Sequence, residues 1–302
     1  ICKEYGDINE ECKNEGYIVN EKISSLMHEK SRENMVKTTA LTMLDYSQIL
    51  KKISSLELNR TPFDYCVIDD FFPSDLAKKL ADEFLDYNDE SWFSYENKLE
   101  HKKLLSDWRK FPSNTYRAFC FLNSNLILET LSSLFDSTLY CDSGLHGGGW
   151  HMHVRGGKLN PHLDYSMHPH LGLQRKLNLI VYLCEDWKDE YGGHFGLWSS
   201  DEETGKAGKL HTEIPIGFNK AVIFDTTQNS WHGLSKEVKC PENMSRKSLA
   251  VYYLCKPTGS VDPRKRALFA PTEEQKGDKE VQDLIEKRAD VNLSKTVYVK
   301  HK

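Results

Sequence analysis

Between Leu139 and Tyr253 the sequence alternates short apolar runs with clusters of glycine, proline and asparagine. Apolar runs of roughly four to eight residues that are bounded by such residues are typical of β-strands. A long succession of these runs predicts a β-sandwich or a β-barrel. The sequence therefore predicts that the centre of the chain folds as β-structure.

Helices are expected around this region. After Pro73, the residues Leu76, Leu80 and Phe84 share one face of a helix, and Ser74 is the expected N-cap. Residues 124–135 show a second amphipathic pattern. The expected fold class is therefore mainly β with flanking helices (α+β).

Three segments are expected along the chain. Residues 1–59 are polar and form a helical N-terminal extension, in which Ile49, Ile53 and Leu56 fall at helical spacing. The main domain covers residues 60–256 and opens at Pro62, since proline stops a helix and extends its neighbour. Residues 257–302 form a charged, partly helical tail. The N-terminal helices could support an oligomer.

Candidate metal ligands lie in the β region. His162 and Asp164 are two residues apart, so an extended strand places both side chains on one face. The apolar strand 221–224 leads to a third candidate, His232. Two histidines and one carboxylate form the facial triad of non-haem Fe(II) oxygenases, which leaves the opposite coordination positions open. Seven other histidines compete for this role: His146, His151, His153, His168, His170, His194 and His211.

The motifs around these residues follow a known order. They run over Gly147–Tyr165, Arg175–Leu183, Tyr191–Trp198, Pro215–Asp225 and Ser245–Leu254. In this order the chain resembles the 2-oxoglutarate- and Fe(II)-dependent dioxygenases, specifically the prolyl 4-hydroxylase-like branch, over roughly residues 60–256. The resemblance implies a double-stranded β-helix, which is a jelly roll of two sheets. It also implies Fe(II), 2-oxoglutarate and O2, with ascorbate as a supporting reductant, and His162, Asp164 and His232 as the metal ligands.

The carboxylate of 2-oxoglutarate that is buried in the β-helix needs a cationic partner, and a guanidinium can bind it through two parallel hydrogen bonds. Strand alternation places Arg246 and Ser248 on one face and Lys247 on the other. The family pattern puts Arg246 inside as the carboxylate partner, with Ser248 as a lesser donor. By resemblance, Tyr182 corresponds to a tyrosine that hydrogen-bonds the same carboxylate, although a packed core tyrosine fits the sequence equally well.

The expected reaction hydroxylates a substrate C–H bond and releases succinate and CO2. Peptidyl proline is the first expectation for the substrate, and His151 and Arg155, just before the triad, are candidate substrate contacts. One alternative is hydroxylation of a small molecule, a sugar or a nucleotide. Another is a catalytically silent jelly-roll binding module.

Charge and composition narrow these choices. The formal net charge of −5 gives no field that favours nucleic acid or an anionic membrane, and the short basic run Arg264–Arg266 is expected to be a solvated loop. No stretch approaches the ~20 apolar residues of a membrane-spanning helix.

The eight cysteines form no pair separated by two residues, so we expect mainly buried free thiols, with a bridge between Cys2 and Cys12 possible only in an oxidising compartment. A cytoplasmic location is favoured.

Overall fold

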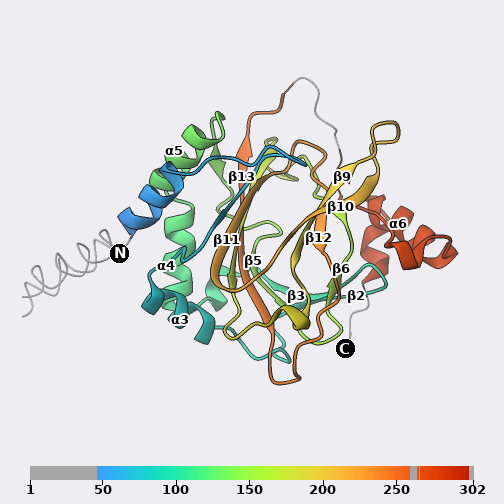
Figure 1. Cartoon of the computed structure of the whole chain (residues 1–302), viewed down its shortest axis with the longest axis horizontal. Helices are drawn as coiled ribbons and strands as arrows, with labels where there is room; N and C mark the ends of the chain where they lie inside the picture. The colour runs from blue at the N-terminus through green and yellow to red at the C-terminus, as the bar shows by residue number, and fades with distance from the viewer. Residues whose placement is uncertain (1–45, 259–263, 265, 299–302) are drawn as a thin grey trace, which may run out of the picture. The chain divides into compact units, whose positions relative to one another are not determined.

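The computed structural model describes residues 46–258, 264 and 266–298 (Figure 1). The chain divides into two units, Ile1–Ser47 and Gln48–Lys302, and the second contains every element described below. Residues 48–54 are helical, with Ile49 and Ile53 buried, as their spacing predicts. The other expected N-terminal helices and the Cys2–Cys12 pair lie outside the described residues.

The larger of two antiparallel sheets has nine strands within the described residues. The main path is β1-β11-β8-β13-β5-β3-β2, with β4 paired to β13 and β6 to β3. Its strands are β1 (Tyr65–Ile68), β2 (Phe93–Glu96), β3 (Glu100–Leu105), β4 (Tyr140–Cys141), β5 (Gly149–His153), β6 (Lys158–Leu159), β8 (Gln174–Leu183), β11 (Phe218–Asp225) and β13 (Arg246–Cys255). At Gly149, where β5 lies against β3, a side chain would collide with the carbonyl oxygen of Leu105.

The smaller sheet has the order β10-β9-β12-β7-β14. Its strands are β7 (His162–Leu163), β9 (Phe195–Ser200), β10 (Ala207–Ile214), β12 (His232–Leu234) and β14 (Leu268–Phe269). The sheets pack face to face, since one buried apolar cluster joins Tyr182 and Phe224 of the large sheet to Phe195 and Leu197 of the small one. From β5 to β13 the chain passes repeatedly between the sheets, which confirms the expected double-stranded β-helix.

Three helices cover the outer face of the large sheet (Figure 1): α3 (Ser74–Asp82), α4 (Ser113–Leu122) and α5 (Asn125–Leu134). Outward-facing residues of β13 contact them, because Lys247 Nζ donates a hydrogen bond to the Ala81 carbonyl and the Tyr253 hydroxyl donates one to that of Leu122. Two of these helices were predicted, and α4 was not. Ser74 is not the N-cap of α3: Pro73 occupies that position, and no side chain caps it.

The segment from 91 to 112 contributes the strands β2 and β3 to the large sheet. After residue 257 the chain adds α6 (Lys279–Ala289), which is capped by the Asp278 side chain. Thr272 forms a capping box on the short 3₁₀ helix Glu273–Gln275. Val281 of α6 is fully buried against Leu99 and Phe269, so the tail packs on the β domain.

The described cysteines are all free thiols, and most are buried as expected, but Cys120 is exposed. Within the described part of the chain, none of the helices combines the length and the apolar character needed to cross a lipid bilayer.

Candidate metal centre

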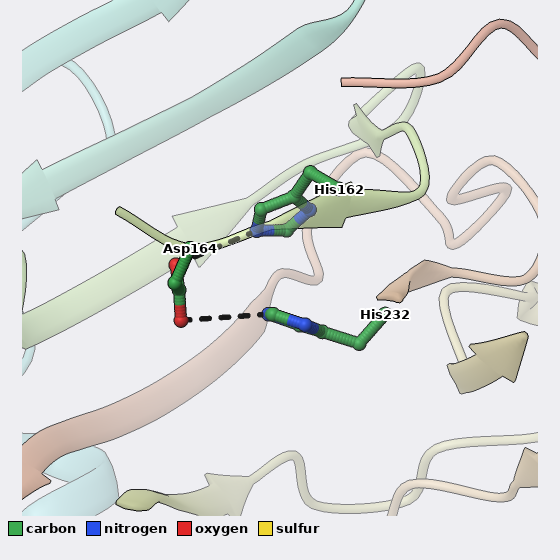
Figure 2. Close-up of side chains that lie close together, drawn as sticks. All are labelled: His162, Asp164 and His232. Carbon is green, nitrogen blue, oxygen red and sulfur yellow. Dashed lines mark ion pairs between the residues drawn. The ribbon is translucent and has the colours of Figure 1, made fainter. Parts of the chain in front are cut away.

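The fold brings His162, Asp164 and His232 together (Figure 2). His162 begins β7 and His232 begins β12, and the two are directly paired across the small sheet. Asp164 follows β7. One ligand atom from each residue lies within 4.8 Å of the others. The Nε2 atoms of His162 and His232 each lie 3.8 Å from an Asp164 carboxylate oxygen, and all three side chains are buried.

Backbone hydrogen bonds set the orientation of both imidazoles. His162 Nδ1 lies 3.0 Å from the Asn160 carbonyl oxygen, and His232 Nδ1 lies 2.8 Å from that of Ser230. Because a carbonyl oxygen only accepts, each Nδ1 carries the proton and each Nε2 presents its lone pair toward Asp164. Burial lowers the pKa of both histidines below the ordinary value. Both are therefore neutral at physiological pH, the form that binds a metal, and we expect protonation to displace a metal only well below pH 6.5.

The two oxygens of Asp164 have different surroundings. Oδ1 accepts a hydrogen bond of 3.3 Å from the Tyr252 hydroxyl and lies 3.7 Å from Arg175 Nη1. Oδ2 is buried and has no hydrogen-bond partner among the described residues. Burial raises the pKa of Asp164, but the nearby His232, Arg175 and His162 together outweigh it and hold the pKa below its usual value. Oδ2 is thus an ionised oxygen without a hydrogen-bond partner among the described residues, and it lies 3.8 Å from His232 Nε2, whereas His162 Nε2 lies 3.8 Å from Oδ1.

Arg175 fixes this arrangement. Its guanidinium carbon lies 3.5 Å from the ring centre of Tyr165 and 3.4 Å from that of Tyr252, so the cation is stacked between two aromatic faces. Its Nη2 donates to the His146 carbonyl. The side chain is only 2% exposed. Sequence reasoning missed this residue, because a lone arginine at the start of an apolar strand carries no signal that it turns inward.

We expect Arg175→Met to weaken metal binding by roughly tenfold to a hundredfold, the usual effect of losing a residue that orients a metal ligand. Methionine keeps much of the volume between the two tyrosine rings but leaves Asp164 Oδ1 with only Tyr252. Calorimetric titration with Mn(II) measures the affinity, and Lys176→Met, the neighbouring position, serves as the control. Equal affinities in the wild type and Arg175→Met would contradict this role.

Residues 148–254 match the sequence model of the 2OG-Fe(II) oxygenase superfamily. This region belongs to that superfamily. The expected enzyme class, a 2-oxoglutarate- and Fe(II)-dependent dioxygenase, is confirmed, and the superfamily implies Fe(II), 2-oxoglutarate and O2. No curated protein sequence matches the chain.

Several solved structures match the oxygenase. A prolyl 4-hydroxylase from Pseudomonas putida is 15% identical, with 70% of this chain and 98% of that chain covered and a TM-score of 0.48. A prolyl 4-hydroxylase from Phytophthora capsici is 19% identical, with 82% and 76% covered and a TM-score of 0.48. A prolyl hydroxylase from Trichoplax adhaerens, in complex with a hypoxia inducible factor peptide fragment, is 16% identical, with 71% and 92% covered and a TM-score of 0.45.

The three residues expected to bind the co-substrate share the inner face of the large sheet. Ser248 is paired directly with Tyr182, and the Arg246 guanidinium carbon lies 4.8 Å from the Tyr182 ring centre. All three are buried, and Arg246 Nε donates a 2.7 Å hydrogen bond to the Gly193 carbonyl. Burial raises the pKa of Tyr182 to about 12, so its hydroxyl stays protonated, and within residues 46–258, 264 and 266–298 it has no hydrogen-bond partner.

The two candidate substrate residues lie in different surroundings. His151 is paired with Ser248 on the inner face, and its Nε2 lies 3.2 Å from the Gly147 carbonyl oxygen. Arg155 is exposed in the turn after β5. The next inward residue of β5, His153, is paired with Arg246 and only 2% exposed, and both ring nitrogens are without a hydrogen-bond partner among the described residues. The alternation of His151 and His153 is the sequence signal that could have identified it.

The metal-free protein is expected to lose stability as the pH falls from about 7.5 to about 5.5. Burial lowers the pKa of His151 to about 3 and holds that of His153 well below its ordinary value. The unfolded chain takes up these protons near pH 6.5, whereas the folded chain does not, so the free energy of unfolding decreases by roughly 1 kcal/mol per histidine at pH 5.5. Thermal unfolding in EDTA at graded pH measures this. His151→Leu should show a shallower dependence, and a constant midpoint in the wild type would refute the explanation.

Proposed function

We propose that this chain uses Fe(II), 2-oxoglutarate and O2 to hydroxylate a peptidyl residue, with proline the first candidate, and releases succinate and CO2. The observation that carries the proposal is the buried cluster of His162, Asp164 and His232, whose ligand atoms lie within 4.8 Å of one another. Two neutral imidazoles and one carboxylate on one side of an ion suit Fe(II) and leave positions for other ligands.

The residues of the triad fit the metal. The Nε2 atoms of His162 and His232 present lone pairs, and Asp164 Oδ2 is a buried anionic oxygen that lacks a protein partner in the described part of the chain. Such an unpaired buried charge is costly unless a cation binds it. Bound Fe(II) would supply the chemistry that activates O2, while the protein holds the ligands and excludes water.

The inner face of β8, β13 and β5 fits the far carboxylate of 2-oxoglutarate. Arg246 would pair with it, the Tyr182 hydroxyl would donate to it, and Ser248 would add a further donor. Buried donors without partners are rare in folded proteins and indicate a missing ligand or water. The Tyr182 hydroxyl and His153 are such groups, and both lie beside Arg246.

Succinate formation from 2-oxoglutarate tests the proposal directly. The assay contains Fe(II) and ascorbate and is run without substrate, with proline-containing peptides, and with a panel of small molecules. We expect stimulation by a peptide and a 16 Da mass increase on its proline. Stimulation by a sugar or nucleotide alone would replace the peptide by a small-molecule substrate. The absence of turnover, together with no binding of metal or 2-oxoglutarate, would favour a silent binding module.

A further inference from the structure

Lys102 of β3 faces the inside of the β-helix. Leu104 is paired with His151, and Lys103 with Met152. Since side chains alternate along a strand, Glu100 and Lys102 share the inner face with Leu104 and His151. Lys103 faces the other way, where its Nζ contacts the Tyr87 carbonyl. The Lys102 side chain is only 12% exposed, which is low for a lysine.

The Lys102 ammonium lacks a close hydrogen-bond or ion-pair partner among the described residues. The nearest carboxylate oxygen is Glu100 Oε2 at 3.5 Å, which is longer than a normal N–H···O hydrogen bond. The other Glu100 oxygen already accepts bonds of 3.0 and 2.9 Å from Arg288. Thus one buried carboxylate is shared by two cations, and the structure shows no hydrogen bond from Lys102 to any described residue.

A continuous set of contacts joins this region to the metal centre. Phe269 stacks on His162 with ring centres 5.2 Å apart, and the Arg288 guanidinium carbon lies 5.2 Å from the Phe269 ring centre. Arg288 binds Glu100, which in turn neighbours Lys102. The β3–β5 register also places Lys102 beside His153, which is paired with Arg246. Lys102 therefore lines the same interior as the residues proposed to hold the co-substrate.

Arg266 belongs to the same region. Its Nε is buried and has no hydrogen-bond partner among the described residues. Burial raises the pKa of Tyr95 to about 12, and the Arg266 charge acts in the opposite direction on both Tyr95 and Tyr298, whose ring centres lie 5.1 Å apart. Lys102 Nζ lies 5.1 Å from the Tyr95 ring centre. Arg266 lies in a loop, as expected, but it is half-buried, and the next residue, Ala267, packs against the cluster of Leu99, Phe269 and Val281.

Positive charge exceeds negative charge around the metal centre. Three carboxylates, Asp142, Asp164 and Glu100, are opposed by the five cations Lys102, Arg175, Arg246, Arg266 and Arg288. Fe(II) and the 2-oxoglutarate dianion would cancel each other, so the excess persists after both bind. The chain as a whole has a net charge of −5, so this excess is a local property of the site. A substrate that carries a carboxylate would offset it.

We propose that the substrate is an acidic peptide, in which an aspartate or glutamate close to the hydroxylated residue pairs with Lys102 and Arg266. This inference rests on the proposed hydroxylase function. Lys102 of β3 and Arg266, in the segment before β14, would form a subsite that binds the substrate carboxylate and so selects acidic peptides.

Two peptide pools of equal length test the subsite. Both have a central proline, and the flanking positions carry aspartate and glutamate in one pool and asparagine and glutamine in the other. Succinate formation and the 16 Da mass increase are measured for the wild type, Lys102→Gln and the matched control Lys103→Gln, which changes the same residue type on the opposite face. Calorimetry of 2-oxoglutarate with the Mn(II)-loaded protein is run in parallel.

We expect the wild type to prefer the acidic pool and Lys102→Gln to lose roughly tenfold to a hundredfold of that preference, the usual effect of removing one charged hydrogen bond. Lys103→Gln should keep the preference, and 2-oxoglutarate binding should be unchanged in both variants. The subsite would be overturned if the wild type used the amide pool as well as or better than the acidic pool, or if it turned over 2-oxoglutarate but used neither pool. An unchanged preference in Lys102→Gln would also overturn it. A wild type that neither binds nor consumes 2-oxoglutarate would instead remove the hydroxylase function.

Discussion

Asp164→Ala is expected to abolish turnover and to reduce metal affinity strongly. The reduction should exceed the roughly tenfold to hundredfold loss that is typical when a residue that only orients a metal ligand is changed. The variant removes the anionic oxygen Oδ2, which lies 3.8 Å from His232 Nε2 and has no hydrogen-bond partner in the described structure. Calorimetric titration with Mn(II) and the succinate assay measure the two effects.

Loss of the Asp164 carboxylate also leaves Arg175 buried without its nearest anionic neighbour, which can cost about 3–5 kcal/mol of stability. Asp164→Asn keeps the side-chain volume and the hydrogen bond from Tyr252 and removes only the charge, so it distinguishes loss of the charge from loss of packing. Thermal unfolding of both variants shows whether each is folded, since both leave Arg175 without this anionic neighbour. Asp283→Ala, an exposed aspartate on α6, is the control. If a folded Asp164→Asn protein bound metal and turned over like the wild type, the triad would be wrong. His162→Ala, which removes an Nε2 ligand, should give the same loss of metal and activity.

Arg246→Ala is the second large effect that we expect. The dissociation constant for 2-oxoglutarate should rise by roughly thirtyfold or more, because truncation of one partner of a buried charge pair costs about 2–5 kcal/mol. Metal affinity should be preserved, since Arg246 makes its one strong hydrogen bond to the Gly193 carbonyl. Calorimetry with the Mn(II)-loaded protein measures both constants.

Comparison with 2-oxobutyrate, which lacks the second carboxylate, makes the test of Arg246 specific. Its affinity should be the same in the wild type and in Arg246→Ala. Lys247→Ala is the matched control, because Lys247 lies on the outer face and donates to the Ala81 carbonyl. Arg246→Lys should recover part of the affinity through its charge, but not the paired hydrogen bonds of a guanidinium. Unchanged binding of 2-oxoglutarate in Arg246→Ala would remove the carboxylate assignment.

Much of the site could be predicted because strand geometry is local. A spacing of two residues places His162 and Asp164 on one face, and alternation separates Arg246 from Lys247 whatever the neighbouring strands are. The structure indeed places Arg246 with Ser248 and Tyr182 on one inner face, and brings the triad together. The same alternation places His153 on the inner face together with His151, so the sequence supported His153 as a site residue as strongly as His151.

Other features depend on pairings that no local pattern encodes. The strands β2 and β3 contain polar and charged residues, such as Lys102 and Glu100, that in the sequence alone resemble a solvated segment. Only the pairing of β3 with β5 turns these side chains inward. In the same way, Arg175 lies at an ordinary strand start and becomes part of the metal centre only through Tyr165, Tyr252 and Asp164, all of which lie on other strands or loops.

The resemblance of the sequence motifs to a known family predicted the jelly roll, the oxygenase class and the residues expected to hold the metal and the co-substrate. Short-range spacing along a strand by itself determined that His162 shares a face with Asp164, and Arg246 with Ser248. The tertiary structure alone decided which charged residues surround that centre. Arg175, Lys102, Arg266 and Arg288 come from separate parts of the chain, and their proximity is set by long-range strand pairing and by the packing of the tail against Phe269. Burial makes an unpaired charge costly, and burial is a property of that assembled structure and of no single segment.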